Sequence, residues 1–157
     1  MSMSSAFLLC LVLCPSILIF SMIGGVIVSH GLLGEEMINT AEMIVGKIEN
    51  ITSVSIDVTT DVESSREQIR RAIKTVNHGS GVIIFTDMFG GTPSNISLSF
   101  LDESHIEVIT GVNLAMLIQL SMSHTDEPFQ DLVKTLKQRG QENIHIASEF
   151  LQQRSKK

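Results

Sequence analysis

The chain has 157 residues, of which 43% are hydrophobic and 18% charged, enough apolar material for the core of one domain. Eleven Lys and Arg stand against seventeen Asp and Glu, and aromatic residues make up only 4%. A net charge of −6 with no basic stripe, and few rings for base stacking, argues against a protein that binds nucleic acid.

The chain begins with an apolar segment: no Asp, Glu, Lys or Arg occurs in residues 1–34, and residues 6–20 are almost purely apolar. Together with residues 22–28 they form a run long enough to span a bilayer, which takes about 20 apolar residues. A cleaved signal is a further interpretation, although no positive region precedes the run. Because Met22 stands directly before a well-formed strand, we expect residues 1–21 to be a mis-assigned start or a dispensable extension outside the fold, with an anchor or a signal as alternatives.

Beyond residue 21, apolar runs rich in β-branched residues alternate with segments whose apolar residues recur every three or four positions. The first pattern predicts buried strands and the second predicts amphipathic helices. Strands are expected at residues 22–28, 51–58, 81–86, 105–110 and 143–147. Helices are expected at residues 34–46, 63–77, 92–101, 113–123 and 126–139. The expected domain covers residues 22–147, and residues 148–157 form a polar tail.

Strands and helices that alternate in this way indicate βαβ units with right-handed crossovers. We therefore predict an α/β fold, a doubly wound and mostly parallel sheet with helices on both faces. In such sheets, chemistry collects beyond the carboxyl ends of the strands, where the winding reverses. The residues that follow each predicted strand are therefore the candidates for a functional site.

His30 is the first ionisable residue after the first predicted strand, and Gly31 follows it. A loop histidine is often only a structural residue bound to a backbone carbonyl. At the end of a parallel strand it is equally a candidate nucleophile, because neutral imidazole is abundant near pH 7. The remaining histidines have no such place before a glycine-rich partner loop, and we expect them to be structural: His78, His105, His124 and His145.

The third predicted strand is followed by Asp87 and then by the pair Gly90 and Gly91. Glycine lets the backbone approach a ligand closely. Thr92 and Pro93 are predicted to open the next helix as its N-cap and first residue. Because backbone amides at such a turn attract anions, we interpret Gly90, Gly91 and Thr92 as phosphate-binding rather than as an ordinary capped turn.

The ends of the first and third strands are often neighbours in a doubly wound sheet, so His30 and Asp87 are expected to converge. A carboxylate bound to one imidazole nitrogen leaves the other free to carry a phosphoryl group. Asn113, after the fourth strand, either caps the next helix or faces the same crevice. With no Walker motif and no metal-ligand cluster, we expect neither cofactor nor metal, and phosphoryl transfer to His30 from a protein rather than from ATP.

Three segments, IVSHG, FTDMFGGTPSN and EVITGVNLAML, resemble in order and spacing the enzyme IIA domain of the mannose/fructose/sorbose family of the bacterial phosphotransferase system. The resemblance covers about residues 22–147. It implies a cytoplasmic phosphocarrier, membrane-anchored only if the N-terminal apolar segment is genuine. By position it implies that His30 is the phosphorylated histidine, Asp87 its carboxylate partner and Thr92 the loop hydroxyl, where family members often carry Ser.

The resemblance also implies partners for the chain. HPr is then the phosphoryl donor, and a separate enzyme IIB chain is the acceptor, which serves sugar uptake through membrane IIC and IID subunits or serves regulation. In the family, a short antiparallel strand is exchanged within a homodimer, and residues 143–147 correspond to that strand.

Three other functions remain as alternatives. A receiver domain phosphorylated on Asp87 needs an acidic Mg²⁺-binding pair after the first strand, where this chain has Ser29 and His30. A flavin or nucleotide module would carry a G-x-G-x-x-G motif after that strand, and none is present. The phosphocarrier domain that feeds dihydroxyacetone kinase shares a histidine after the first strand, but the GGTPSN loop resembles the sugar-transport family.

Overall fold

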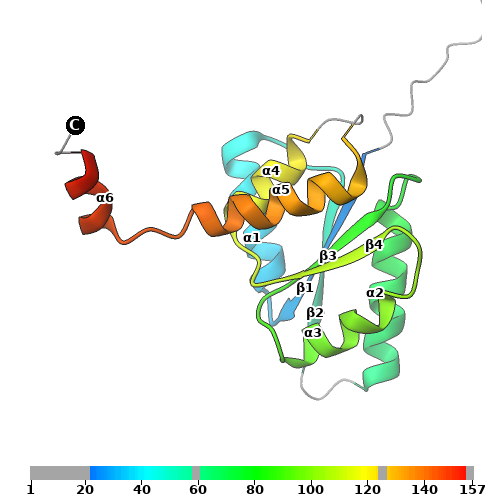
Figure 1. The fold of residues 1–157 in the computed structure, drawn as a ribbon. Helices are drawn as coiled ribbons and strands as arrows, with labels where there is room; N and C mark the ends of the chain where they lie inside the picture. The colour runs from blue at the N-terminus through cyan, green and yellow to red at the C-terminus, as the bar shows by residue number, and fades with distance from the viewer. Residues whose placement is uncertain (1–21, 58–60, 124–126, 155–157) are drawn as a thin grey trace, which may run out of the picture.

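The computed structural model describes residues 22–57, 61–123 and 127–154. These residues form one four-stranded sheet with helices around it (Figure 1). The strands are β1 (Gly24–His30), β2 (Ile51–Ile56), β3 (Val82–Thr86) and β4 (Ile106–Thr110). The helices are α1 (Leu33–Val45), α2 (Val62–Val76), α3 (Thr92–Ser97), α4 (Leu114–Ser121), α5 (Phe129–Glu142) and α6 (Ala147–Arg154), and a 3₁₀ turn, η1 (Leu98–Phe100), extends α3.

All strand pairs in this sheet are parallel, and the strand order is β2-β1-β3-β4. The chain winds from β1 outward to β2, then returns past β1 to β3 and continues to β4. A right-handed crossover must change faces when the direction of winding changes. Accordingly α1 covers one face, and α2 and α3 cover the other (Figure 1). The predicted doubly wound α/β fold is confirmed.

The core has two layers because successive residues of a strand point to opposite faces of the sheet. Ile27 and Phe85 pack with side chains of α1, α4 and α5. Val28 and Ile84 pack on the other face with side chains of α2 and α3. Strands covered on both faces need apolar residues at nearly every position, which is why they appear in the sequence as continuous apolar runs.

The reversal of winding puts β1 and β3 side by side in the centre of the sheet. Their parallel register pairs Val28 with Thr86, so β3 ends at Thr86 while β1 continues only to His30, close to the same edge of the sheet. The two loops that leave these ends, residues 31–32 and 87–91, are therefore neighbours. This is the point of a doubly wound sheet at which ligands bind.

The predicted fifth strand is wrong for the single chain. Residues 143–146 are not a strand; they leave the end of α5 and lead to α6, which lies away from the sheet (Figure 1). Ile144 and Ile146 are 77% and 62% exposed. Their alternation with polar residues is strand-like, but a strand also needs a neighbour to pair with, and among the described residues the segment has none. The polar tail expected from residue 148 onward begins as a helix, since α6 covers Ala147–Arg154.

The expected extension at residues 1–21 lies outside the described residues. The second half of that apolar stretch, residues 22–28, is described. It leads into the central strand β1, in which Val26, Ile27 and Val28 are completely buried. Those residues are therefore part of the domain core. Within the described ranges, none of the helices is both long enough and apolar enough to cross a bilayer.

Candidate functional site

His30 is the last residue of β1, and its side chain is 41% exposed. Gly31 follows with a φ of 54°, a left-handed conformation in which glycine has no Cβ strain, so the chain can turn sharply out of the strand. The Ser29 hydroxyl then accepts a hydrogen bond from the Gly34 N–H (2.9 Å), which fixes the first turn of α1 against the strand. These contacts hold the imidazole at the exit of the strand, half open to solvent.

Asp87 follows the last residue of β3, and its carboxylate meets His30. The Asp87 Oδ2 atom lies 2.6 Å from His30 Nδ1 and accepts the His30 backbone N–H at 2.9 Å. Oδ1 accepts the Met88 N–H at 2.8 Å. Because an ionised carboxylate can only accept, the imidazole proton lies on Nδ1 and the lone pair on Nε2.

The Asp87 side chain is only 11% exposed, and its surroundings act on its pKa in two directions. Burial is the largest single influence and raises the pKa. Three hydrogen bonds lower the pKa, from the His30 backbone, the His30 ring and the Met88 backbone, and so does the charge of His30. Together they outweigh the effect of burial, so the pKa of Asp87 is lowered overall. The carboxylate is therefore ionised near neutral pH.

The glycine-rich loop lies against the same imidazole. A Cβ atom on Gly91 would stand 3.2 Å from His30 Cε1, so glycine at this position lets the loop backbone approach the ring. Gly90 has a φ of 82° in an exposed turn. The structure thus brings His30, Asp87, Gly90 and Gly91 together.

The start of α3 differs by one residue from the expectation. Gly91, not Thr92, is the N-cap: it has extended backbone angles, and its carbonyl accepts the Asn95 N–H at 3.0 Å. Thr92 is the first helical residue, and its exposed side chain makes no capping bond. The sequence pattern predicted Thr92 as the N-cap because its hydroxyl could accept a capping hydrogen bond, whereas glycine has no side chain to do so. Thr92 nevertheless adjoins the loop at the His30 ring.

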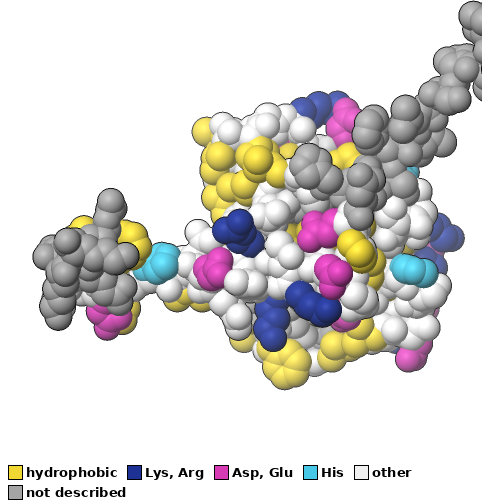
Figure 2. All heavy atoms as spheres, turned by 45° about the horizontal axis from the view of Figure 1, so that its top comes forward, with side chains coloured by type: hydrophobic (Ala, Val, Ile, Leu, Met, Phe, Trp, Pro, Cys, Tyr) yellow, Lys and Arg dark blue, Asp and Glu magenta, His cyan; other side chains and the backbone are white. Residues whose placement is uncertain are grey.

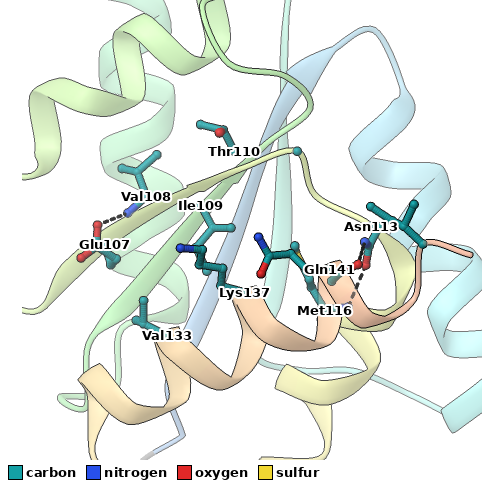
Figure 3. A pocket seen from close by; sticks show the side chains of 12 residues that line it. Glu107, Val108, Ile109, Thr110, Asn113, Met116, Val133, Lys137 and Gln141 are labelled. Carbon is teal, nitrogen blue, oxygen red and sulfur yellow. Dashed lines mark hydrogen bonds between the residues drawn. The ribbon is translucent and has the colours of Figure 1, made fainter.

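Asn113 is not part of this group. Its Oδ1 accepts the Met116 N–H (3.3 Å), which makes it the N-cap of α4, and its Nδ2 donates to the Gly140 carbonyl (2.9 Å) in α5. Of the two roles considered for Asn113, the structure supports the capping role. Asn113 also lines a cavity of ≈ 410 Å³ between β4 and α5, across which side chains of α5 face the strand (Figure 3).

A feature that sequence reasoning missed surrounds His30. Leu32 and Leu33 follow it in the chain, and Met88 and Phe89 follow Asp87; all four side chains are exposed, Phe89 by 74%. We call these four residues the apolar collar. The only signal in the sequence is that loops at strand ends, which are usually polar, contain large apolar residues here. Beside the collar, His30, Ser55 and Asp57 line an open hollow of ≈ 300 Å³.

The charges on the face seen in Figure 2 are mixed, with Lys and Arg side chains interspersed among Asp and Glu. A nucleic-acid footprint would need a continuous basic patch. Among the residues that the structure describes, no group of three or more His, Cys, Asp or Glu side chains is placed to hold a metal ion.

Comparison with known proteins bears on this site. Residues 24–137 match the family model described as the fructose IIA component of the phosphotransferase system, PTS. The chain is 33% identical over 121 residues to the PTS mannose-specific EIIAB component of Escherichia coli K12, an alignment that covers 76% of this chain but only 38% of that protein. It is 27% identical over 132 residues to the PTS fructose-specific EIIA component of Bacillus subtilis, covering 83% and 90% of the two chains.

A solved structure agrees with these relatives. The crystal structure of PTS component EIIA from Streptococcus agalactiae superposes with a TM-score of 0.73 at 27% identity, over 82% of this chain and 99% of that one. The family model alone covers well over half of the chain. The chain therefore belongs to the enzyme IIA family of the sugar phosphotransferase system, in its mannose/fructose/sorbose branch.

Proposed function

We propose that this chain is a phosphohistidine carrier: His30 accepts a phosphoryl group from phospho-HPr and passes it to an enzyme IIB partner. Membership of the family makes the chain a component of a sugar phosphotransferase system. The observation that carries the finer proposal is the pairing of His30 Nδ1 with Asp87 Oδ2 at 2.6 Å, beside a glycine loop at the switch point of the sheet.

The transfer step follows from that pairing. The lone pair on His30 Nε2 attacks the phosphorus of the donor's phosphohistidine; the new N–P bond forms as the donor's N–P bond breaks, and the electron pair leaves with the donor imidazole. The proton stays on Nδ1, so Asp87 faces a cationic phosphoimidazole and stabilises it. Backbone amides of the loop around Gly90 and Gly91 are the candidates to bind the phosphoryl oxygens, since Gly91 lies against the His30 ring. Passing the group to IIB is the same displacement in reverse.

The surroundings of the carboxylate favour His30 over Asp87 as the phosphoryl acceptor. Asp87 is almost buried, and three hydrogen-bond donors occupy its two oxygens. An attack by Asp87 on phosphorus would have to break those bonds. His30, by contrast, has one nitrogen bound and the other available.

The apolar collar supports a protein as the phosphoryl donor. Protein–protein interfaces have an apolar centre in which aromatic residues and Met are enriched, and charged residues are depleted there. The collar consists of exposed Met88 and Phe89 from the loop after β3 and exposed Leu32 from the loop after β1, and neither loop contains Lys or Arg. A small phosphorylated molecule would be held by cations, whereas a protein donor can be held by this apolar surface.

We also propose that the chain forms a homodimer by strand exchange. We call residues 143–146 the arm. Its Ile144 and Ile146 are exposed, and β4 is an edge strand beside the ≈ 410 Å³ cavity (Figure 3). If the arm of one copy pairs with β4 of the other, both features are satisfied: the edge is closed, and each buried Ile contributes about 1.5–3 kcal/mol.

The test of the carrier function is phosphorylation in a reconstituted system with enzyme I, HPr and phosphoenolpyruvate. The wild-type chain should acquire an acid-labile, base-stable phosphoryl group, and His30→Ala should abolish it. Matched controls are His78→Ala, His105→Ala, His124→Ala and His145→Ala, which should label normally. Full labelling of His30→Ala would end the proposal, and onward transfer to a purified IIB protein tests the acceptor.

A further inference from the structure

The arm leaves a helix end that is fixed by hydrogen bonds. α5 ends at Glu142, and Asn143 caps it, donating from Nδ2 to the Arg139 carbonyl at 2.9 Å. The Ile144 N–H donates to the Gln141 carbonyl at 3.3 Å. The arm then continues outward from α5 to α6 (Figure 1). The last turn of α5 therefore sets the direction in which the arm leaves.

The same turn is attached to the core through Asn113. The Asn113 amide spans two elements: Oδ1 caps α4, and Nδ2 donates to Gly140 O at 2.9 Å (Figure 3). Gly140 is buried, and a Cβ there would come within 2.0 Å of Met116 Cε and 3.3 Å of Asn113 Nδ2. Glycine thus allows α5 to lie directly on the start of α4. We call the Asn113–Gly140 contact the joint.

The direction of α5 makes it difficult for the arm to fold onto its own β4. The start of α5 lies near the start of β4, since a Cβ on Gly81 would contact both Phe129 and the His105 carbonyl. The end of α5 lies at Asn113, beyond the end of β4. Helix and strand therefore run the same way, and an arm antiparallel to its own β4 would need a full reversal directly after Glu142.

The sequence at this place is not suited to a tight reversal. Two-residue reversals depend on Gly, Asn or Asp with positive φ. Residues 141–146 contain neither Gly nor Pro, and the one Asn, Asn143, has a φ of −94° and uses its side chain as a helix cap. A short hinge that cannot close within a chain favours exchange of the following segment between two chains.

We propose that the joint and the Asn143 cap form a rigid hinge that commits the arm to a second copy of this chain instead of its own β4. The inference rests on the homodimer of the proposed function and adds what decides between exchange and a closed monomer. Asn113 is then a positioning residue for assembly and has no part in phosphoryl transfer.

The decisive experiment inserts a flexible turn into the hinge. Insertion of Gly-Asn-Gly between Glu142 and Asn143 in the full chain should let each arm close on its own β4. Sedimentation equilibrium should then show a monomer at concentrations where the wild type is a dimer, with the dimer Kd raised at least tenfold. The matched control carries the same insertion between Arg154 and Ser155 and should remain a wild-type dimer. An unchanged dimer, or larger assemblies, from the hinge insertion would overturn the inference.

Asn113→Asp tests the joint separately. An aspartate keeps the oxygen that caps α4 but has no N–H for Gly140, so the monomer should stay folded and its unfolding temperature should fall by only a few degrees. The dimer Kd should rise severalfold, because an end of α5 that is no longer held at Asn113 does not fix the direction of the arm. A wild-type Kd in this variant would remove Asn113 from the hinge. If the wild-type chain is a monomer in solution, both the proposed dimer and the proposed hinge are wrong. The His30 labelling experiment would still decide the carrier function.

Discussion

The switch point between β1 and β3 differs from the sheet edge at β4. The difference lies in how many of the groups that each place needs are supplied by a single chain. At the switch point, one chain supplies the imidazole, the carboxylate and all three donors to that carboxylate. At the edge, one chain supplies a strand that pairs with β3 on one side and with no described strand on the other, a cavity beside it and an arm with two exposed isoleucines. The groups of the proposed chemistry are therefore preorganised within one chain, whereas the proposed assembly surface is present in one chain only as two complementary halves.

The first prediction tests the switch point by removing the negative charge of Asp87. Asp87→Asn keeps the shape of the side chain but can donate to Nδ1, which favours the wrong tautomer, and it no longer stabilises a cationic phosphoimidazole. Phosphoryl transfer from phospho-HPr should slow by a factor on the order of 10²–10⁴. Rapid-quench labelling measures the rate. Wild-type transfer by this variant would show that Asp87 is only a loop acid.

The second prediction concerns the sheet edge at β4 and should leave phosphorylation at the switch point unchanged. In the proposed dimer the two isoleucines of each arm are buried, so the double variant Ile144→Ser/Ile146→Ser removes four buried side chains and should raise the dimer Kd by at least about 100-fold. Labelling of His30 within the isolated monomer should persist. Ile44→Ser, which replaces an exposed isoleucine of α1, is the matched control and should not change the Kd. Equal dimerisation of all three chains by sedimentation would contradict strand exchange.

The third prediction concerns the apolar collar, which we propose is the docking surface for the donor protein at the switch point. Phe89→Ser should raise the KM for phospho-HPr about tenfold and leave kcat nearly unchanged, because the side chain acts in docking only. Folding should be unaffected, since Phe89 is mostly exposed. Met43→Ser removes a similarly exposed apolar side chain from α1 and serves as control. A lowered kcat with an unchanged KM would place Phe89 in the chemical step.

The same contrast explains which parts of the molecule could be predicted from sequence. β1 and β3 are buried on both faces, so their apolar runs and the glycines after them located His30 and Asp87 correctly at strand ends. Ile144 and Ile146 alternate as in a strand, but an alternating pattern does not show which strand they would pair with or whether that strand belongs to the same chain. The exposure of Leu32 and Phe89 could not be predicted either, because hydropathy does not distinguish a loop residue that is buried from one that awaits a partner.

The smallest expected effect is on stability, and it tests whether the switch point is complete without a partner. The folded chain lowers the pKa of Asp87, so the ionised carboxylate stabilises the fold above the pKa of an unfolded Asp, about 3.9. That contribution is lost as pH falls through the lower folded-state pKa. Urea unfolding at pH 7, 4 and 3 should therefore show the advantage of the wild type over Asp87→Asn shrinking on the acid side, since asparagine does not titrate. A constant difference between the two proteins would mean that Asp87 gains nothing from its three donors, and that the site is organised only when a partner docks.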